Sequence, residues 1–202
     1  MILYTLDKIV KIEINPSKHI GAMLSGGMDS ALMLYIMLMA MPLGTKLTVF
    51  NVPNVKDNAK YFSTKIASFL ENKFNYPISI QNVGDTTLPH NKIINYSGKY
   101  ILENKLVDIL YVGINQNPPV ILPTTGPWRR NPTDPVPKNL VFPFIDLYKT
   151  HILEIYKQLD ILELADLTHS CTENIGQRCN ICFQCYERAW AYKELGLIDR
   201  GI

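Results

Sequence analysis

The sequence predicts an α/β fold, a doubly wound and mostly parallel sheet with helices on both faces. Over the first 114 residues, short apolar segments typical of strands alternate with longer segments of helical periodicity. Hydrophobic residues make up 47% of the 202 residues, which is enough for one core of this kind. Ligands of such sheets bind at the carboxyl ends of the strands, so functional residues are expected in the loops there.

The first half of the chain contains three predicted strands and two predicted helices. Ile9–Ile14 alternates apolar and charged residues, as a half-exposed strand does, and Ile20–Leu24 is a short apolar strand that ends at two glycines. Ser30–Met41 is apolar throughout and is predicted as a buried helix, ended by the proline and glycine that follow. Lys46–Val52 is the next strand, and the spacing of apolar residues in Asp57–Lys73 predicts an amphipathic helix.

The second half continues the alternation and then changes character. Tyr76–Val83 is predicted as a strand, Ile93–Lys105 as a helix, and the apolar Ile109–Ile114 as a buried strand. A proline-rich segment without periodicity follows over residues 115–138, and long loops in compact domains are often functional. Helices are predicted again over Tyr148–Leu159 and Tyr186–Leu195. We therefore expect an α/β domain over residues 1–160 and a C-terminal segment over residues 161–202 packed on it.

Charge and hydropathy favour a soluble, cytoplasmic protein. The net charge of +2 gives no general attraction to nucleic acids or to anionic membranes. The longest apolar run, Ala31–Leu43, is too short to span a bilayer, and the N-terminus lacks the pattern of a signal peptide. Neither direct nucleic-acid binding nor membrane binding is expected, and a homodimer is considered.

A glycine-containing stretch joins the second predicted strand to the first predicted helix. It reads Ser25-Gly26-Gly27-Met28-Asp29-Ser30. Glycines let backbone N–H groups approach a ligand closely, and the N-terminus of the following helix favours an anion such as phosphate. A carboxylate beside phosphates indicates a bridging Mg²⁺, with Asp29 as its ligand. The lysine of the nucleoside-triphosphatase P-loop is absent. The alternative interpretation is a glycine-rich turn with a serine N-cap.

The four cysteines of the chain lie within 15 residues of one another, at Cys171, Cys179, Cys182 and Cys185. Such clustering indicates a metal site rather than a disulfide framework. Four thiolates suit a tetrahedral structural Zn²⁺ without an open position. The C-x2-C-x2-C run is also similar to the ligand runs of ferredoxins, and four reduced thiols packed as small hydrophobic groups are a third interpretation.

These motifs together resemble the PP-loop ATP pyrophosphatase superfamily, whose S-G-G-x-D-S motif matches residues 25–30. Within it, the 7-cyano-7-deazaguanine synthase family of queuosine precursor biosynthesis carries a T-x-S-C segment before three closely spaced cysteines. Here these are Thr168-His169-Ser170-Cys171 and the cysteines that follow. Weaker similarity is found at 109–115, which resembles V-x-I-G-V-N, and at 142–155, which resembles P-[LF]-x(n)-K-x-E-I.

The resemblance implies a function. Enzymes of this family are ligases that convert 7-carboxy-7-deazaguanine and ammonia to the nitrile through an adenylated intermediate, consuming ATP with Mg²⁺ and releasing AMP and pyrophosphate. It implies that residues 25–30 cradle the pyrophosphate, that Asp29 and Ser30 act in catalysis, and that the four cysteines hold a structural Zn²⁺.

The chain departs from the family pattern in three places. The spacer after Cys171 is one residue short, the family's P-G-R-N appears as residues 89–92 without its arginine, and the segment after residue 115 is replaced by the proline-rich loop. Trp128 is a candidate for stacking on the base, and Arg129 or Arg130 for pairing with its carboxylate. The alternative is a surface loop with solvated charges.

Two other functions remain open from the sequence. One is a PP-loop tRNA thiolase with an iron–sulfur cluster on the same cysteines, and the other is a non-catalytic nucleotide-binding module. Lone histidines such as His90 and His151 are interpreted as structural residues. Lys99 and Lys149 are interpreted as solvated residues of helix faces, with a phosphate contact as the alternative.

Overall fold

The computed structural model describes residues 1–201 except 54–57, 85–89, 128, 130–136 and 175, and it describes no side chains over 90–95. Its main element is a five-stranded parallel sheet with the order β5-β4-β3-β6-β7. The strands are β3 (His19–Met23), β4 (Lys46–Asn51), β5 (Ile80–Asn82), β6 (Ile109–Val112) and β7 (Leu140–Val141).

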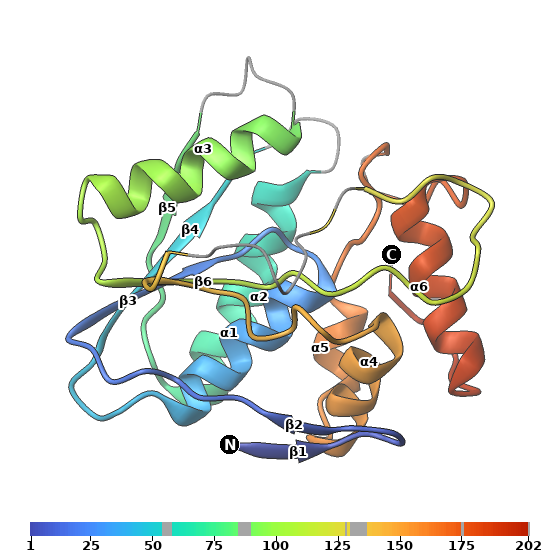
Figure 1. Cartoon of the computed structure of the whole chain (residues 1–202), viewed down its shortest axis with the longest axis horizontal. Helices are drawn as coiled ribbons and strands as arrows, with labels where there is room; N and C mark the ends of the chain where they lie inside the picture. The colour runs from blue at the N-terminus through green and yellow to red at the C-terminus, as the bar shows by residue number, and fades with distance from the viewer. Residues whose placement is uncertain (54–57, 85–89, 128, 130–136, 175, 202) are drawn as a thin grey trace.

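Helices cover both faces of this sheet (Figure 1). α1 (Met28–Ala40) and α2 (Ala59–Phe74) lie on one face, and α3 (His90–Glu103) lies on the other. Side chains along the strands point alternately to the two faces of the sheet. Ala22, Val49 and Tyr111 point into the core under α1, whereas Phe50 and Leu110 point into a second, smaller core with Ile101 of α3. The predicted doubly wound parallel sheet is therefore confirmed.

Three further helices form the orange and red part of the ribbon in Figure 1. They are α4 (Lys149–Gln158), α5 (Leu162–Asp166) and α6 (Phe183–Glu194). Of these, α4 and α5 pack against α1, and α6 packs against α4. Their buried residues, among them Ile152, Leu164 and Ala191, belong to the same core as α1. The C-terminal segment is thus packed on the α/β core. Among the described residues, no helix is both long and apolar enough to cross a membrane.

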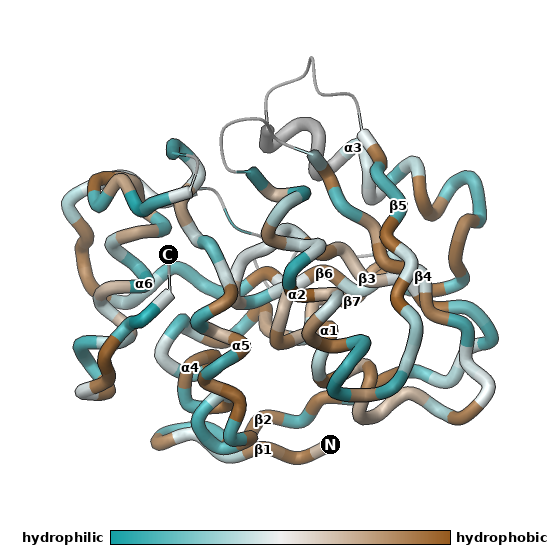
Figure 2. Tube along the Cα trace, turned by 180° about the vertical axis from the view of Figure 1, so that it is seen from behind, coloured by the Kyte–Doolittle hydropathy of each residue, from teal (hydrophilic) through white to brown (hydrophobic). Residues whose placement is uncertain are grey.

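The N-terminus forms a separate hairpin of β1 (Ile2–Tyr4) and β2 (Ile9–Lys11), which pair antiparallel. The strand expected over Ile9–Ile14 pairs with β1 rather than with the main sheet. The backbone N–H of Tyr4 donates to the side chain of Gln158, which fastens the hairpin to α4. Figure 2 shows hydrophobic stretches along β1 and β2, and Ile2 and Ile9 are exposed on the outer side.

Candidate active site and metal centre

The glycine stretch lies at the point where the winding of the sheet reverses. The chain runs from β3 to β4 and β5 in one direction and then returns to place β6 on the other side of β3. Residues 25–27 follow β3, and α1 begins at Met28 with Gly27 as its N-cap. Loops at such a reversal form the ligand-binding crevice of doubly wound sheets, and the N-terminus of α1 there favours an anion.

The loop is held in a compact shape by its two serines. The backbone N–H of Ser25 donates to Ser30 Oγ over 3.1 Å, and Ser30 Oγ donates to the carbonyl oxygen of Gly27 over 3.1 Å. Gly26 has φ +88°, and a Cβ there would lie 2.7 Å from Cβ of Phe62 in α2. A side chain at position 26 is thus excluded both by the backbone conformation and by α2.

The end of β6 approaches the start of α1 closely. A Cβ on Gly113 would lie 2.8 Å from the backbone of Asp29 and from the backbone nitrogen of Ser30. Asn115, two residues further on, is buried. The segment after β6 therefore packs directly against the start of α1.

The side chain of Asp29 contacts Lys149, the first residue of α4. Lys149 Nζ lies 2.7 Å from Asp29 Oδ1 and 2.5 Å from Oδ2, and only 5% of the Lys149 side chain is exposed. The interpretation of Lys149 as a solvated residue of a helix face is therefore wrong. The first turn of α4 faces the carboxyl edge of the sheet instead of solvent, because α4 packs against α1.

A buried glutamate of α6, Glu187, lies close to the same lysine. Glu187, with 1% of its side chain exposed, accepts hydrogen bonds from Arg129 over 2.7 and 2.8 Å and from Asn115 Nδ2 over 3.2 Å. Its carboxylate also lies 3.6 Å from Lys149 Nζ. Burial alone would raise the pKa of Glu187, but the charge of Lys149 and the contacts of Arg129 lower it below its usual value. Both carboxylates of this network are therefore paired with cations.

Of the three candidate base-binding residues, the structure describes Arg129 but not Trp128 or Arg130. Arg129 belongs to the network just described, because its guanidinium pairs with Glu187 and also donates to the carbonyl oxygens of Asn115 and Gln116. Trp128 and Arg130 lie outside the described residues. Arg129 thus fixes the segment after β6 to α6.

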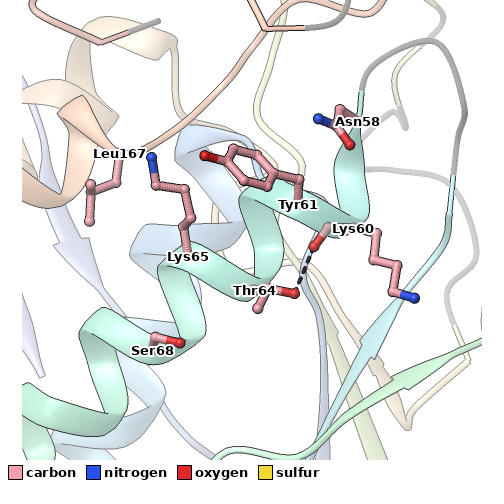
Figure 3. A pocket seen from close by; sticks show the side chains of 7 residues that line it. All are labelled: Asn58, Lys60, Tyr61, Thr64, Lys65, Ser68 and Leu167. Atoms are coloured by element: carbon pink, nitrogen blue, oxygen red, sulfur yellow. Dashed lines mark hydrogen bonds between the residues drawn. The ribbon is translucent and has the colours of Figure 1, made fainter.

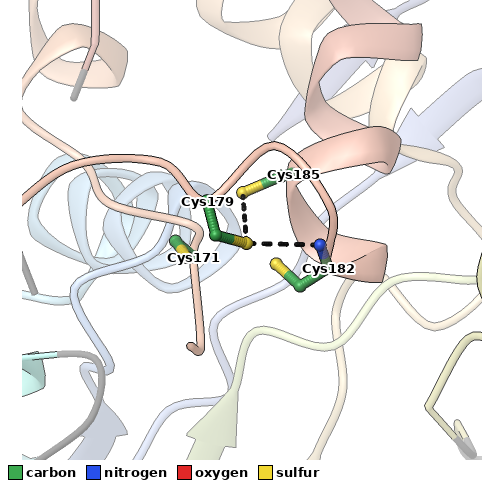
Figure 4. A group of neighbouring side chains, drawn as sticks. All are labelled: Cys171, Cys179, Cys182 and Cys185. Carbon is green, nitrogen blue, oxygen red and sulfur yellow. Dashed lines mark hydrogen bonds between the residues drawn. The ribbon is translucent and has the colours of Figure 1, made fainter. Parts of the chain in front are cut away.

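The four cysteines converge at the N-terminus of α6 (Figure 4). Their Sγ atoms all lie within 4.8 Å of one another, and those of Cys179 and Cys185 are 3.9 Å apart. A tetrahedral ion with metal–sulfur bonds of about 2.3 Å separates its ligand sulfurs by about 3.8 Å. The donor set and its spacing therefore fit one metal ion.

Backbone N–H groups favour the ionised form of one sulfur in this cluster. Burial opposes ionisation of Cys179, but hydrogen bonds from the backbone N–H groups of Ile181 and Cys182 outweigh it and lower the pKa of this thiol to about 7. Burial raises the pKa of Cys171 and of Cys185. The lowered pKa of Cys179 favours its thiolate form near neutral pH, and a bound metal ion would itself ionise coordinating thiols.

A second buried arginine, Arg188 of α6, holds the segment before Cys171. Arg188 is fully buried and donates to the side chain and the carbonyl oxygen of Thr168. Its guanidinium also pairs with Asp199, which pairs in addition with Arg178 beside Cys179. Asp199 thus connects Arg188, which holds the segment before Cys171, with Arg178 next to Cys179.

A shallow hollow of about 580 Å³ lies along the outer side of α2 (Figure 3). It is lined by Asn58, Lys60, Tyr61, Thr64, Lys65, Ser68 and Leu167. The opposite side of α2, with Phe62, contacts the glycine loop. The hollow is therefore separated from the crevice by the helix itself.

Comparison with known proteins supports one family. Residues 134–196 match the family model described as queuosine biosynthesis protein QueC. The 7-cyano-7-deazaguanine synthase of Methanosphaerula palustris is 43% identical over 61 residues, and that of Nostoc sp. is 40% identical over 63 residues. These alignments cover 30% and 31% of this chain, which spans 27% of the length of each curated relative.

Solved structures resemble the chain more distantly. The NMN synthetase of Francisella tularensis has a TM-score of 0.48 and 14% identity, over 91% of this chain and 79% of that one. The U34-tRNA thiolase NcsA of Methanococcus maripaludis with its 4Fe-4S cluster has a TM-score of 0.44 and 12% identity, over 89% of this chain and 68% of that one. The residues that match the family model include Lys149, the four cysteines and Glu187, whereas the glycine loop lies outside them.

Proposed function

We propose that this chain, whose residues 134–196 match the QueC family model, is an ATP-dependent ligase. It converts 7-carboxy-7-deazaguanine and ammonia to 7-cyano-7-deazaguanine, and AMP and pyrophosphate are released. One ATP adenylates the carboxylate for attack by ammonia, and a second activates the amide oxygen so that dehydration gives the nitrile. The observation that carries the proposal is the Asp29–Lys149 pair, because it joins the S-G-G-x-D-S loop to the matched segment in one site.

The loop over residues 25–30 has the main catalytic role in this proposal. The N-terminus of α1 binds the phosphates and stabilises the charge that develops on the departing pyrophosphate. Asp29 would hold Mg²⁺, and its carboxylate oxygens are the donor type that this ion prefers. Mg²⁺, when bound, supplies positive charge to the phosphates. The hydroxyl of Ser30, bonded to the loop backbone, keeps the loop in shape.

The cysteine cluster has a structural role. Cys171, Cys179, Cys182 and Cys185 would hold one Zn²⁺ with all four positions taken by protein, so the ion fixes α6 and no step of the reaction passes through it. A small base and ammonia are the proposed partners, the protein is proposed to act in the cytoplasm, and a homodimer stays a hypothesis.

Incubation with ATP, Mg²⁺, ammonium and 7-carboxy-7-deazaguanine tests the function, with products followed by mass spectrometry. We expect the nitrile together with AMP. Omission of ammonium should stop the sequence before the amide, which separates ligation from simple ATP hydrolysis. Absence of both amide and nitrile, from protein that carries zinc and binds ATP, would contradict the proposed substrate.

A further inference from the structure

The charged residues of the crevice alternate in sign. Asp29, Lys149, Glu187 and Arg129 form a continuous series of two carboxylates and two cations, so their formal charges cancel. Lys149 lies between the two carboxylates, with Asp29 at hydrogen-bonding distance and Glu187 at 3.6 Å. The lysine therefore has one close anionic partner and a second within a short movement of its flexible stem.

Glu187 is the fixed member of this series. Two hydrogen bonds from Arg129 and one from Asn115 hold its carboxylate. Its helix is also fixed at the N-terminus, because Cys182 is the N-cap and Cys185 lies in the first turn. Lys149, by contrast, reaches its partners through a four-carbon side chain with three rotatable donors.

A divalent cation that binds the side of the Asp29 carboxylate facing Lys149 displaces the ammonium of this lysine. An ammonium that is 5% exposed would then be left without a counter-charge unless another carboxylate is within reach, and such a state is strongly unfavourable. Glu187 is that carboxylate. It allows Lys149 to leave Asp29 while remaining paired.

We propose that Glu187 is a positioning residue that determines how readily Asp29 binds a divalent cation, by serving as the second anionic partner of Lys149. This inference rests on the role of Asp29 in the proposed function. With Glu187 neutralised, Lys149 stays on Asp29 and competes more strongly with the cation. With Lys149 neutralised, the competitor is absent and the charge of Glu187 loses its effect.

Titration with Mn²⁺ in the presence of a non-cleavable ATP analogue tests the proposal, with free Mn²⁺ measured by electron paramagnetic resonance. We expect Glu187→Gln to weaken Mn²⁺ binding about tenfold and Lys149→Gln to strengthen it. The double variant should bind Mn²⁺ like Lys149→Gln alone, within about twofold. Glu187→Asp, which keeps the charge, should restore most of the affinity lost in Glu187→Gln.

Glu163→Gln is the control, because it also neutralises a carboxylate that pairs with a lysine, but away from Asp29 and Glu187. It should leave Mn²⁺ affinity unchanged. If Glu187→Gln weakens Mn²⁺ binding equally with and without Lys149, the glutamate acts through its own charge and the proposal is wrong. If Asp29→Asn binds Mn²⁺ as wild type does, Asp29 is not the ligand, and the proposed metal role falls together with this inference.

Discussion

The ammonium of Lys149 lies 2.5 and 2.7 Å from the two carboxylate oxygens of Asp29, although the residues are 120 positions apart in the chain. The pair bridges the start of α1 and the start of α4, so it joins the glycine loop to the segment that carries the family match. Because Lys149 contacts both oxygens, Asp29 is paired before any ligand arrives. A cation that takes the same side of the Asp29 carboxylate therefore competes with Lys149 for it.

Replacement of Asp29 by Asn removes the charge while keeping the size of the side chain. We expect formation of AMP with the proposed substrates to fall by about 10²–10³-fold, because charge stabilisation at the phosphates is lost. Release of AMP is measured by chromatography at saturating ATP. Glu163→Gln, which neutralises an exposed carboxylate paired with Lys73, serves as the control and should keep wild-type activity. Unchanged turnover in Asp29→Asn would show that the charge of Asp29 is not needed for the reaction.

Replacement of Gly113 by Ala should separate β6 from α1. The added Cβ would lie 2.8 Å from backbone atoms of Asp29 and Ser30, and backbone cannot rotate away as a side chain does. We expect a loss of about 1–3 kcal/mol in the free energy of unfolding, together with weaker ATP binding. Chemical denaturation and calorimetric titration measure the two effects.

Gly98→Ala is the matched control for this change. Among the described residues, a Cβ there meets only Leu110, at 3.9 Å, and Gly98 lies within α3. Alanine in a helix interior should stabilise the protein by about 0.5–1 kcal/mol and leave ATP binding unchanged. Equal stability of Gly113→Ala and wild type would show that the two elements tolerate a wider spacing.

Local patterns predicted the sheet, the loop and the cysteine cluster, because each is encoded within a short segment. The apolar strand before Ser25 and the apolar helix after Asp29 place the glycines at a strand–helix turn, as the structure confirms. The cysteines lie within 15 residues of one another, and their sulfurs meet within 4.8 Å. In both cases the spacing of residues along the chain was enough to predict the local structure.

The pairing of charges across the crevice could not be predicted in this way. Arg129 and Glu187 are 58 positions apart, and each occupies a segment with ordinary surface-like composition. Lys149 was interpreted as a residue of a solvated helix face because a lysine in a predicted helix more often lies in solvent than in a buried ion pair. Which face of α4 is buried depends on how it packs on α1, and this depends on the whole fold. A hairpin partner for β2 was missed because three-residue strands carry too little periodicity.

Replacement of Cys182 by Ser should abolish metal binding at the N-terminus of α6. Wild type is expected to contain about one zinc per chain, and the variant less than about a tenth of that, as measured by elemental analysis of protein purified without added metal. Thermal unfolding should occur at a lower temperature, because binding energy at such a site contributes directly to folding.

Asn180→Gly provides a control within the same loop. Asn180 has φ +56°, a conformation that glycine adopts without strain, so this variant should keep its metal. Iron with a charge-transfer absorption in wild type, in place of zinc, would contradict the proposed structural ion and favour an iron–sulfur cluster.

Replacement of Asp199 by Asn should change how stability depends on pH. Burial alone would raise the pKa of Asp199, but hydrogen bonds and charge from Arg188 and then Arg178 lower it below 3.8. A carboxyl group whose pKa is lowered by folding stabilises the protein at every pH above its unfolded value, and this contribution is lost as the pH falls through the folded pKa.

At pH 7 we therefore expect Asp199→Asn to lower the free energy of unfolding by about 1–2 kcal/mol. The difference from wild type should shrink as the pH falls below 3.8. Urea denaturation at pH 7 and near pH 3 measures the free energy of unfolding of both proteins, with Glu163→Gln as an exposed control. A difference that stays constant between the two conditions would mean that the ionised carboxylate contributes nothing beyond its shape.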